Sequence, residues 1–503
     1  MKALKYLSIG LLLTVGFNSC STDFLDAEDT SVLTPDQAGE AAAKNPEAFL
    51  NGMWSYMVEY NHAGNESHDD FGFMSTLFCF EVMSEDIAFD ASHWFIYDYD
   101  FDYRLEQWQR PYQHWELFYT NIAKANEIIG FFPDGPETVA EKGLAGQAYA
   151  MRGMSYYYLI QMFQDFMKKD NSGEIDRDAP GVPIIYLESD GKTQDEITEA
   201  TGRNTVGEVL DAAQSDLEKA VELLEAGYVR PSGDSGKNYI DASVANGLLA
   251  RVYLLTGQWQ KAANAANKAR KNYGLRTFEE LHDGFMNVGA SDVMWGFNHT
   301  TETQTSYASF FSHLSSFAPG YAGVGYCTKL IDARLYSQIA DDDYRKDLFN
   351  GPDGDSSQPT TGSKKPYANL KFGDDGNWTM DYIYMRAPEM VLIEAEAYAH
   401  LGDGAKAASV LKELMAERQP SWNKATVTVK DVELQRRIEL WGEGFRFFDL
   451  KRMNEGIDRN YEGSNHLAGH LLTVPAHDVL WTYQIPRREI QNNEHISQDE
   501  QNP

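Results

Sequence analysis

Apolar residues recur every three to four positions along most of the 503-residue chain. This spacing places them on one face of a helix and predicts a mainly α protein. The expected helices cover residues 36–60, 108–131, 138–167, 205–226, 241–256, 259–272, 387–401, 404–417 and 431–454. Thr205 and Glu208 form a capping-box pattern, which places a helix start at Thr205.

Two neighbouring pairs of these helices share a pattern of small and aromatic residues. The shared positions are Tyr253, Gly257 and Ala262 in the first pair and Tyr398, Gly402 and Ala407 in the second. Glycine permits the tight turn between two antiparallel helices, and the small alanine lets them approach each other. The spacing is that of tetratricopeptide repeats. It predicts a tetratricopeptide-like helical-repeat scaffold, to which the helices over 108–131, 138–167 and 205–226 could add less regular units.

The segment from about 274 to 386 has a different character. It is rich in Gly, Ser, Thr, Asp and aromatic residues, and residues 351–366 have the composition of an exposed loop. The apolar run 293–297 is typical of a short strand and would bury Trp295. We therefore expect a single helical domain over residues 36–503 with a loop-rich insertion that carries short strands.

The N-terminus has the pattern of an export signal. Lys2 and Lys5 precede an apolar run over residues 7–17, which is too short to span a membrane as a helix. Cys20 follows at the position of a lipobox cysteine. Residues 1–19 are therefore expected to be a lipoprotein signal peptide and Cys20 the acylated residue; an ordinary secretory signal is the alternative.

The segment after Cys20 is short and acidic, and residues 20–35 are expected to form a lipidated flexible tether. No later stretch is apolar enough over a sufficient length to span a bilayer, so attachment would depend on the lipid alone. The formal net charge is −33, which argues against nucleic acids and anionic lipid surfaces as partners.

Three cysteines in the whole chain exclude a disulfide scaffold. Cys79 lies in an apolar run that favours a buried thiol, and a disulfide between Cys79 and Cys327 is left open. The chain has no Walker loop, dinucleotide fingerprint or Gly-x-Ser-x-Gly elbow. His466 and His470 are four positions apart but lack a third ligand, so we expect no metal site.

Acidic loops at 170–178 and 374–377 could hold structural Ca²⁺ in an exported protein. Neither loop has the EF-hand spacing, and we expect no cofactor. A further group of charged residues invites a catalytic interpretation: Arg386, Glu389, Arg437, Glu439, Glu443, Arg446, Asp449 and Arg452. Pairing of these groups between helices is the stronger interpretation, because arginine and carboxylate form bidentate contacts that fix a scaffold.

Sequence runs spread over nearly the whole chain carry a family resemblance. They are Cys20 with 23–26, 148–159 with 181–183, 249–254 with 257–259, 385–397, 437–452, 485–490 and 501–503. Together they resemble the SusD/RagB family of surface nutrient-binding lipoproteins of the Bacteroidota, and the run 437–452 is the most specific. Pro388 departs from the family pattern and is expected in the first turn of its helix.

The resemblance implies a right-angled scaffold of about four tetratricopeptide-like helix pairs and a variable ligand-binding insertion. It implies a lipid-anchored outer-membrane protein at the cell surface. Such a protein would capture oligosaccharide or polysaccharide without catalysis and pass it to a SusC-like TonB-dependent transporter. The same scaffold binding peptide or another non-sugar nutrient is the alternative, and a glycan-degrading enzyme is a further one.

Aromatic residues in an early segment are the first candidates for ligand binding. Residues 93–103 alternate aromatic residues with aspartates, as in a strand with one buried face or in the rim of a site for sugars. The family places a ligand aromatic in this early loop, which favours Trp94, with Tyr97 beside it. Asp98 could accept hydrogen bonds from hydroxyl groups. Burial of Trp94 in the core is the alternative.

A second aromatic-rich stretch lies within the insertion, over residues 298–326. The family draws ligand contacts from the corresponding region. Tyr307 and Tyr321 are the candidates there, because a phenol ring in a loop offers both a flat face and a hydroxyl group.

Overall fold

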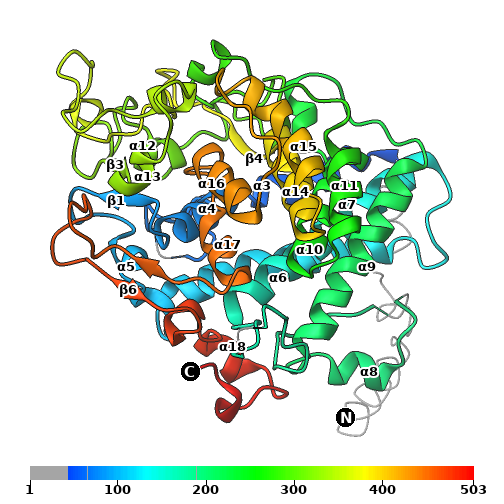
Figure 1. The fold of residues 1–503 in the computed structure, drawn as a ribbon. Coiled ribbons are helices and arrows are strands. Elements are labelled where there is room, and N and C mark those ends of the chain that lie inside the picture. Colours follow the sequence, from blue (N-terminus) through cyan, green and yellow to red (C-terminus); the bar gives the residue numbers. More distant parts are fainter. Residues whose placement is uncertain (1–43, 65, 171, 188–189) are drawn as a thin grey trace, which may run out of the picture.

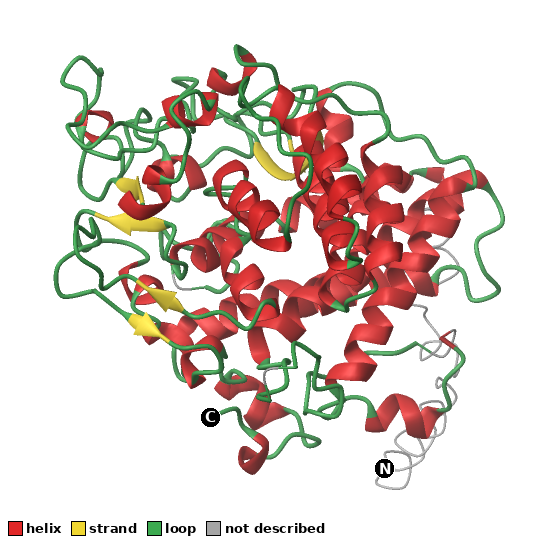
Figure 2. Ribbon diagram, in the orientation of Figure 1, coloured by secondary structure: helices red, strands yellow, loops and turns green. Residues whose placement is uncertain are grey.

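The structure is a computed structural model that describes residues 44–64, 66–170, 172–187 and 190–503. As predicted, it is mainly helical, with a few short strands on the loop-rich side (Figure 2). The expected signal peptide, Cys20 and the tether lie outside the described residues. Within the described ranges, none of the helices combines the length and the apolar character needed to cross a membrane.

The helices and strands follow one another along the chain as follows (Figure 1). In the first half the helices are α3 (Pro46–Tyr56), α4 (Phe73–Val82), α5 (Ile96–Tyr99), α6 (Gln109–Gly130), α7 (Val139–Phe163), α8 (Gln194–Glu199), α9 (Val206–Glu225), α10 (Ala242–Leu255) and α11 (Trp259–Arg270). In the second half they are α12 (Phe310–Leu314), α13 (Ala333–Ser337), α14 (Ala387–His400), α15 (Gly404–Ala416), α16 (Val429–Glu439), α17 (Arg446–Arg452) and α18 (Arg487–Asn492). The strands are β1 (Ile87–Phe89), β2 (Val293–Phe297), β3 (Lys329–Ile331), β4 (Tyr382–Arg386), β5 (Ile457–Asp458) and β6 (Thr473–Val474).

The two predicted repeat pairs are confirmed as α10 with α11 and α14 with α15. Gly257 and Gly402 connect the helices of each pair with φ angles of 68° and 79°, in the left-handed region that glycine adopts without strain. Ala262 and Ala407 are fully buried at 0% exposure. Helix α11 also packs on α14, so the two pairs are adjacent in space although they are far apart in sequence. Helix α7 packs on α6 and α9 as further, less regular units.

The helix expected over 431–454 is broken in the structure into α16 and α17. Gly442 and Gly444 between them have φ angles of 83° and 88°. The carboxylate of Glu81 accepts hydrogen bonds from the backbone N–H groups of Gly442, at 2.9 Å, and Gly444, at 2.9 Å. A carboxylate from a distant helix therefore stabilises the turn that interrupts the apolar period.

Helix α4 lies in the centre of the molecule, and all its residues are buried. It was not among the expected helices, because a helix that is apolar on every side has no amphipathic period. Cys79 in α4 has the buried thiol expected of it, and its Sγ lies 3.3 Å from a carboxylate oxygen of Asp98. Cys327 is also a free, buried thiol, so the two cysteines do not form a disulfide.

The strands form two-stranded antiparallel pairs, β1 with β3, β2 with β4, and β5 with β6. Trp295 in β2 is fully buried, as predicted from its apolar run. In the β1–β3 pair, Ile87 lies opposite Ile331 and Phe89 opposite Lys329. This pairing brings the insertion beside the early segment, and in Figure 1 β3 and α12 lie just above β1. The loops that follow β1 and α12 meet there.

Candidate functional site

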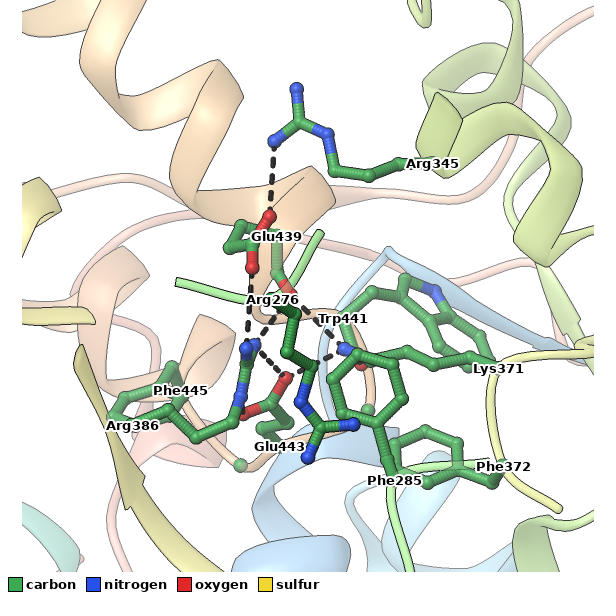
Figure 3. Close-up of polar contacts among 12 residues, drawn as sticks. Arg276, Phe285, Arg345, Lys371, Phe372, Arg386, Glu439, Trp441, Glu443 and Phe445 are labelled. Carbon is green, nitrogen blue, oxygen red and sulfur yellow. Dashed lines mark hydrogen bonds and ion pairs between the residues drawn. The ribbon is translucent and has the colours of Figure 1, made fainter. Parts of the chain in front are cut away.

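A network of buried charges joins β4 to the end of α16 and the turn that follows it (Figure 3). Arg386 donates hydrogen bonds to Glu443 at 2.6 and 2.9 Å, and its guanidinium lies 3.3 Å from Glu439. Lys371 also pairs with Glu443, at 2.6 Å. Burial alone would raise the pKa of Glu439, but Arg418 and Arg386 lower it well below its usual value. These carboxylates stay ionised and committed to cations.

The other charged residues of the group named from the sequence are paired in the same way. The pairs are Arg251 with Glu389, Arg437 with Asp86, Arg446 with Glu85 and Glu433, Arg436 with Asp449, and Arg452 with Glu396 and Asp449. The predicted pairing is confirmed, but only some pairs join two helices, such as Arg251 of α10 with Glu389 of α14. Others reach a turn, such as Arg437 of α16 with Asp86 after α4. Arginine–carboxylate contacts of this kind hold the parts of the scaffold in fixed positions.

A pocket of about 460 Å³ opens where the early segment meets the insertion. One of its walls is aromatic and contains residues of both segments. The centroids of the Trp94 and Tyr321 rings are 6.3 Å apart, and the rings are inclined at 60° in an edge-to-face arrangement. His68 lies against the Trp94 ring at 5.6 Å, and its Nδ1 is 2.6 Å from the Tyr321 hydroxyl. Tyr307 also stacks on His68, with the ring centroids 6.3 Å apart at an interplanar angle of 14°, and its ring lies 5.5 Å from that of Tyr321.

The opposite wall is built from the segment around α5. Tyr97 stacks on Tyr103 with the ring centroids 4.7 Å apart, and Trp108 lies 5.5 Å from Tyr103. Tyr97 lines the pocket and is 52% exposed, and Tyr307, which lies beside the pocket, is 49% exposed. Large aromatic groups that remain in contact with solvent at and beside one pocket are typical of a binding surface.

The local backbone explains why the walls have this shape. Phe95 and Phe101 have positive φ angles of 67° and 60°, and the short helix α5 lies between them. The strand alternative for residues 93–103 was therefore wrong. Phe95 is buried against Phe78, with the ring centroids 4.8 Å apart, whereas Trp94 is half-buried and lines the pocket. Phe95 also borders the pocket, so the turn places a buried ring and a half-buried ring next to each other in its lining.

The floor of the pocket is polar and centres on Arg110, at the start of α6. Its guanidinium donates to both carboxylate oxygens of Asp98, at 2.8 and 2.6 Å, and to Asp69 at 2.7 Å. Burial alone would lower the pKa of Arg110, but the charges of Asp69 and Asp98 raise it well above its usual value. Burial raises the pKa of Asp98, which shares this cation with Asp69.

The sequence-predicted residues come together to different degrees. The pocket is lined by Trp94, Tyr97, Asp98 and Tyr321. Tyr307 lies beside the pocket, where its ring contacts those of His68 and Tyr321. The Asp98 carboxylate, however, has 0% exposure and is committed to Arg110. Both of its oxygens accept hydrogen bonds from Arg110, so the carboxylate is not free for the hydroxyl groups that it was expected to bind.

Several residues of the site were missed from the sequence. His68 and Arg110 join the walls and the floor, and His93 stacks on the exposed Tyr326 with centroids 5.8 Å apart. Burial, with a smaller contribution from Lys329, lowers the pKa of His93. Nothing in their local sequence separates these residues from ordinary polar loop and helix positions. Their partners lie in other segments.

The histidine pair considered for a metal site binds separate groups. His466 contacts the Tyr99 hydroxyl at 2.5 Å, and His470 contacts Asp100 at 2.7 Å. Over the ranges that the structure describes, no group of three His, Cys, Asp or Glu side chains is placed to hold a metal ion. In the acidic loop 374–377, Asp375 accepts hydrogen bonds from Asn377 and Thr379, as in a closed turn.

Two family profiles match long parts of the chain. One, described as "Starch-binding associating with outer membrane", matches residues 23–254, and one described as "SusD family" matches residues 331–503. A SusD-like protein of Formosa agariphila is 24% identical over 388 residues, which cover 68% of this chain and 71% of the relative.

Solved structures share the fold over nearly the full length. A SusD-like carbohydrate-binding protein from Bacteroides vulgatus is 25% identical, with a TM-score of 0.74, and the match covers 91% of this chain and 98% of that one. A laminarin-binding SusD-like protein is 19% identical, with a TM-score of 0.62 and coverage of 92% and 99%. Sequence profiles, relatives and fold agree, and the chain belongs to the SusD family.

Proposed function

We propose that this protein captures oligosaccharide or polysaccharide in the pocket between the early segment and the insertion. The observation that carries the proposal is the pair of aromatic walls, with Trp94 and Tyr321 on one side and Tyr97 and Tyr103 on the other. A sugar ring presents apolar CH groups on its faces, and these stack on flat aromatic rings. Solved relatives described as carbohydrate-binding and laminarin-binding support this assignment.

The polar floor favours binding over hydrolysis. Glycosidases use two carboxyl groups that flank the bond to be broken, on opposite sides of a cleft. Here Asp69 and Asp98 lie on the same side and bind the same guanidinium, that of Arg110. Neither is placed as the partner of the other across a substrate. We therefore propose a protein that binds its ligand without transforming it.

Calorimetric titration of the purified protein with a polysaccharide panel tests this function. We expect saturable binding to at least one glycan, no release of reducing ends, and loss of binding in Trp94→Ala. Peptide mixtures form the second arm, because the same scaffold could serve a non-sugar nutrient. Binding of peptides with no response to any glycan would replace the proposal with that alternative.

For localisation, we propose a lipid anchor at Cys20 and exposure on the outer membrane. The family profile whose description refers to the outer membrane supports this. Cys20→Ala should abolish labelling by a fatty-acid probe and move the protein from the membrane fraction to the soluble fraction. Label that persists in Cys20→Ala would exclude Cys20 as the anchor.

We also propose that the bound ligand is passed to a SusC-like TonB-dependent transporter. Family membership supports this partner, because a lipid-anchored binding protein needs a separate channel to move a glycan inward. Mild-detergent pull-down of the tagged protein from its native membrane should recover a large barrel protein. Recovery of the lipoprotein alone, under conditions that preserve other outer-membrane complexes, would contradict the partnership.

A further inference from the structure

The cation in the floor of the pocket has no hydrogen-bond donor left for a ligand. A guanidinium carries five N–H groups. In Arg110, Nε and one N–H of Nη2 donate to Asp98, and the second N–H of Nη2 donates to Asp69 at 2.7 Å. Nη1 donates to the backbone carbonyl of Asp69 at 3.1 Å and to Gln113 at 2.5 Å. All five donors are thus committed within the protein.

The balance of charge around this cation is negative. Among the described residues that line the pocket, Arg110 is the one lysine or arginine, and it faces both Asp69 and Asp98. The nearby cations of the insertion are also engaged. Lys329 is 1% exposed and donates to the backbone carbonyl of Cys327 at 3.1 Å, and Lys365 is paired with Asp90.

An anionic ligand needs an uncommitted cation, and the described residues that line this pocket offer none. Proteins bind carboxylate, sulfate or phosphate groups through uncommitted cations, most often arginine in bidentate geometry. An anion moved out of water without such a partner loses its hydration and gains no compensating charge. Hydroxyl groups need only neutral donors and acceptors, which the tyrosines and Gln109 can supply beside the stacking rings.

We infer that this pocket selects uncharged glycans and discriminates against glycans that carry carboxylate or sulfate groups. The inference rests on the proposed glycan binding and adds the substrate class to it. The net charge of −33 acts in the same direction at long range, but salt screens that effect. The commitment of Arg110 acts at the site itself, where salt screens electrostatic interactions much less.

The test uses pairs of polysaccharides that share a backbone, one member of each pair being neutral and the other carrying sulfate or carboxylate groups. The neutral members are laminarin, starch, mannan, levan and methyl-esterified homogalacturonan. The charged members are their own sulfated derivatives and, for the last, the de-esterified chain. Binding to the full mature protein is measured by calorimetry at low and at high salt. We expect the charged member of each bound pair to bind at least about tenfold more weakly at both salt concentrations.

The outcomes separate the inference from the proposed function. Charged members that bind as well as or better than their neutral partners would overturn the inference and leave glycan binding intact. A deficit that disappears at high salt would assign the discrimination to the overall charge and would also overturn the inference. Absence of binding to every member of the panel would reject glycan binding and the inference together.

A variant in the floor tests the cause. Asp69→Asn removes one of the two negative charges on Arg110 and replaces it with a neutral amide, whose oxygen can still accept the guanidinium N–H. We expect the ratio of neutral to anionic affinity to fall by at least about threefold. Asp102→Asn removes the same charge from an exposed position outside the pocket and should leave the ratio unchanged. Equal ratios in both variants would contradict the role of Arg110. The wild-type comparison decides the substrate class even if Asp69→Asn does not fold.

Discussion

The hydroxyl of Tyr321 lies 2.6 Å from Nδ1 of His68, and this contact joins residues 253 positions apart in the sequence. His68 lies in the loop before α4, and Tyr321 follows α12 in the insertion. The contact fixes the orientation of both rings beside Trp94. The aromatic wall is therefore a tertiary structure that forms only when the insertion packs on the early segment.

Tyr321→Phe tests this contact, because it keeps the ring and removes the hydroxyl. The lost bond lies within the protein, so the free energy of unfolding should fall by about 0.5–1.5 kcal/mol, a small shift in melting temperature for a chain of this length. We expect weaker glycan binding as well, because the ring of Tyr321 is no longer held in its orientation beside Trp94. Tyr253→Phe is the matched control, since its hydroxyl bonds to Glu218 at 2.6 Å within the scaffold. Calorimetry should show normal affinity for the control. Equal affinities in the two variants would remove the hydroxyl of Tyr321 from the binding function.

Trp94→Ala should weaken glycan binding by about 2 kcal/mol or more, which is over tenfold in affinity, because it removes a stacking ring from the pocket wall. Trp94 is half-buried, so its loss should destabilise the fold by less than the about 3–5 kcal/mol typical of a core aromatic. Phe278→Ala is the control, because Phe278 is 40% exposed and contacts His282 and Tyr344 away from the pocket. Normal ligand affinity in a folded Trp94→Ala protein would eliminate Trp94 from the site.

Ala407→Leu should destabilise the repeat scaffold by about 1–3 kcal/mol, because the fully buried Ala407 leaves no room for a larger side chain. The equivalent change in the first pair, Ala262→Leu, should have an effect of the same size. Ala405→Leu, at an exposed position of the same helix α15, adds the same atoms without overpacking. Denaturant unfolding measures all three. Equal stability of the 405 and 407 variants would contradict the close helix contact.

Glu439→Ala should destabilise the fold by about 3–5 kcal/mol, because it leaves several buried cations without their shared carboxylate (Figure 3). Glu439 contacts Arg418 at 2.8 Å, Arg386 at 3.3 Å and Arg345 at 3.4 Å. Glu413→Ala, which breaks the more exposed pair with Arg270, should cost much less. If the two variants unfolded at the same denaturant concentration, the buried network would not stabilise the scaffold as its geometry indicates.

Much of the fold could be predicted from the sequence, because repeat helices carry a local period. The regular pairs follow from spacing within a few turns of helix. The break between α16 and α17 could not be found in this way, since it depends on Glu81, which is 361 positions away from Gly442. Helix α4 was missed for a local reason: because all its residues are buried, it has no amphipathic period.

The candidate site was predicted less completely than the fold. Trp94 and Tyr321 were found because aromatic loop residues in a family pattern have a recognisable chemistry. His68 and Arg110 were missed, because their importance lies in partners from other segments. Asp98 was predicted for a role that its partners prevent. Its carboxylate among aromatic residues suggested an acceptor for ligand hydroxyl groups, but in the folded protein it is buried and paired with Arg110.

A buried histidine packs against the aromatic wall, and its protonation should make the fold less stable in acid. His313 lies beneath Tyr321, with the ring centroids 5.1 Å apart, and its Nε2 is 2.8 Å from the backbone carbonyl of His68. Burial, aided by the charge of Lys329, lowers the pKa of His313 to about 3. A histidine in the unfolded chain has a pKa of about 6.5.

The unfolded chain therefore binds the proton more tightly than the folded protein in the pH range between these two values. The stability contributed by neutral His313 is fully present above pH 6.5, and it is lost as the pH falls toward the folded pKa of about 3. At about 1.4 kcal/mol per pKa unit, this one group should lower the free energy of unfolding by about 2–3 kcal/mol between about pH 6.5 and pH 4.5.

His313→Gln keeps an N–H donor for the carbonyl of His68 but cannot titrate. Its stability at neutral pH should be lower, because the stacked ring is lost, and its further decrease on acidification should be smaller than in the wild type. Denaturant unfolding at the two pH values measures both quantities, with the exposed His282→Gln as control. An acid-dependent decrease in His313→Gln as large as in the wild type would show that His313 is not a source of the acid sensitivity.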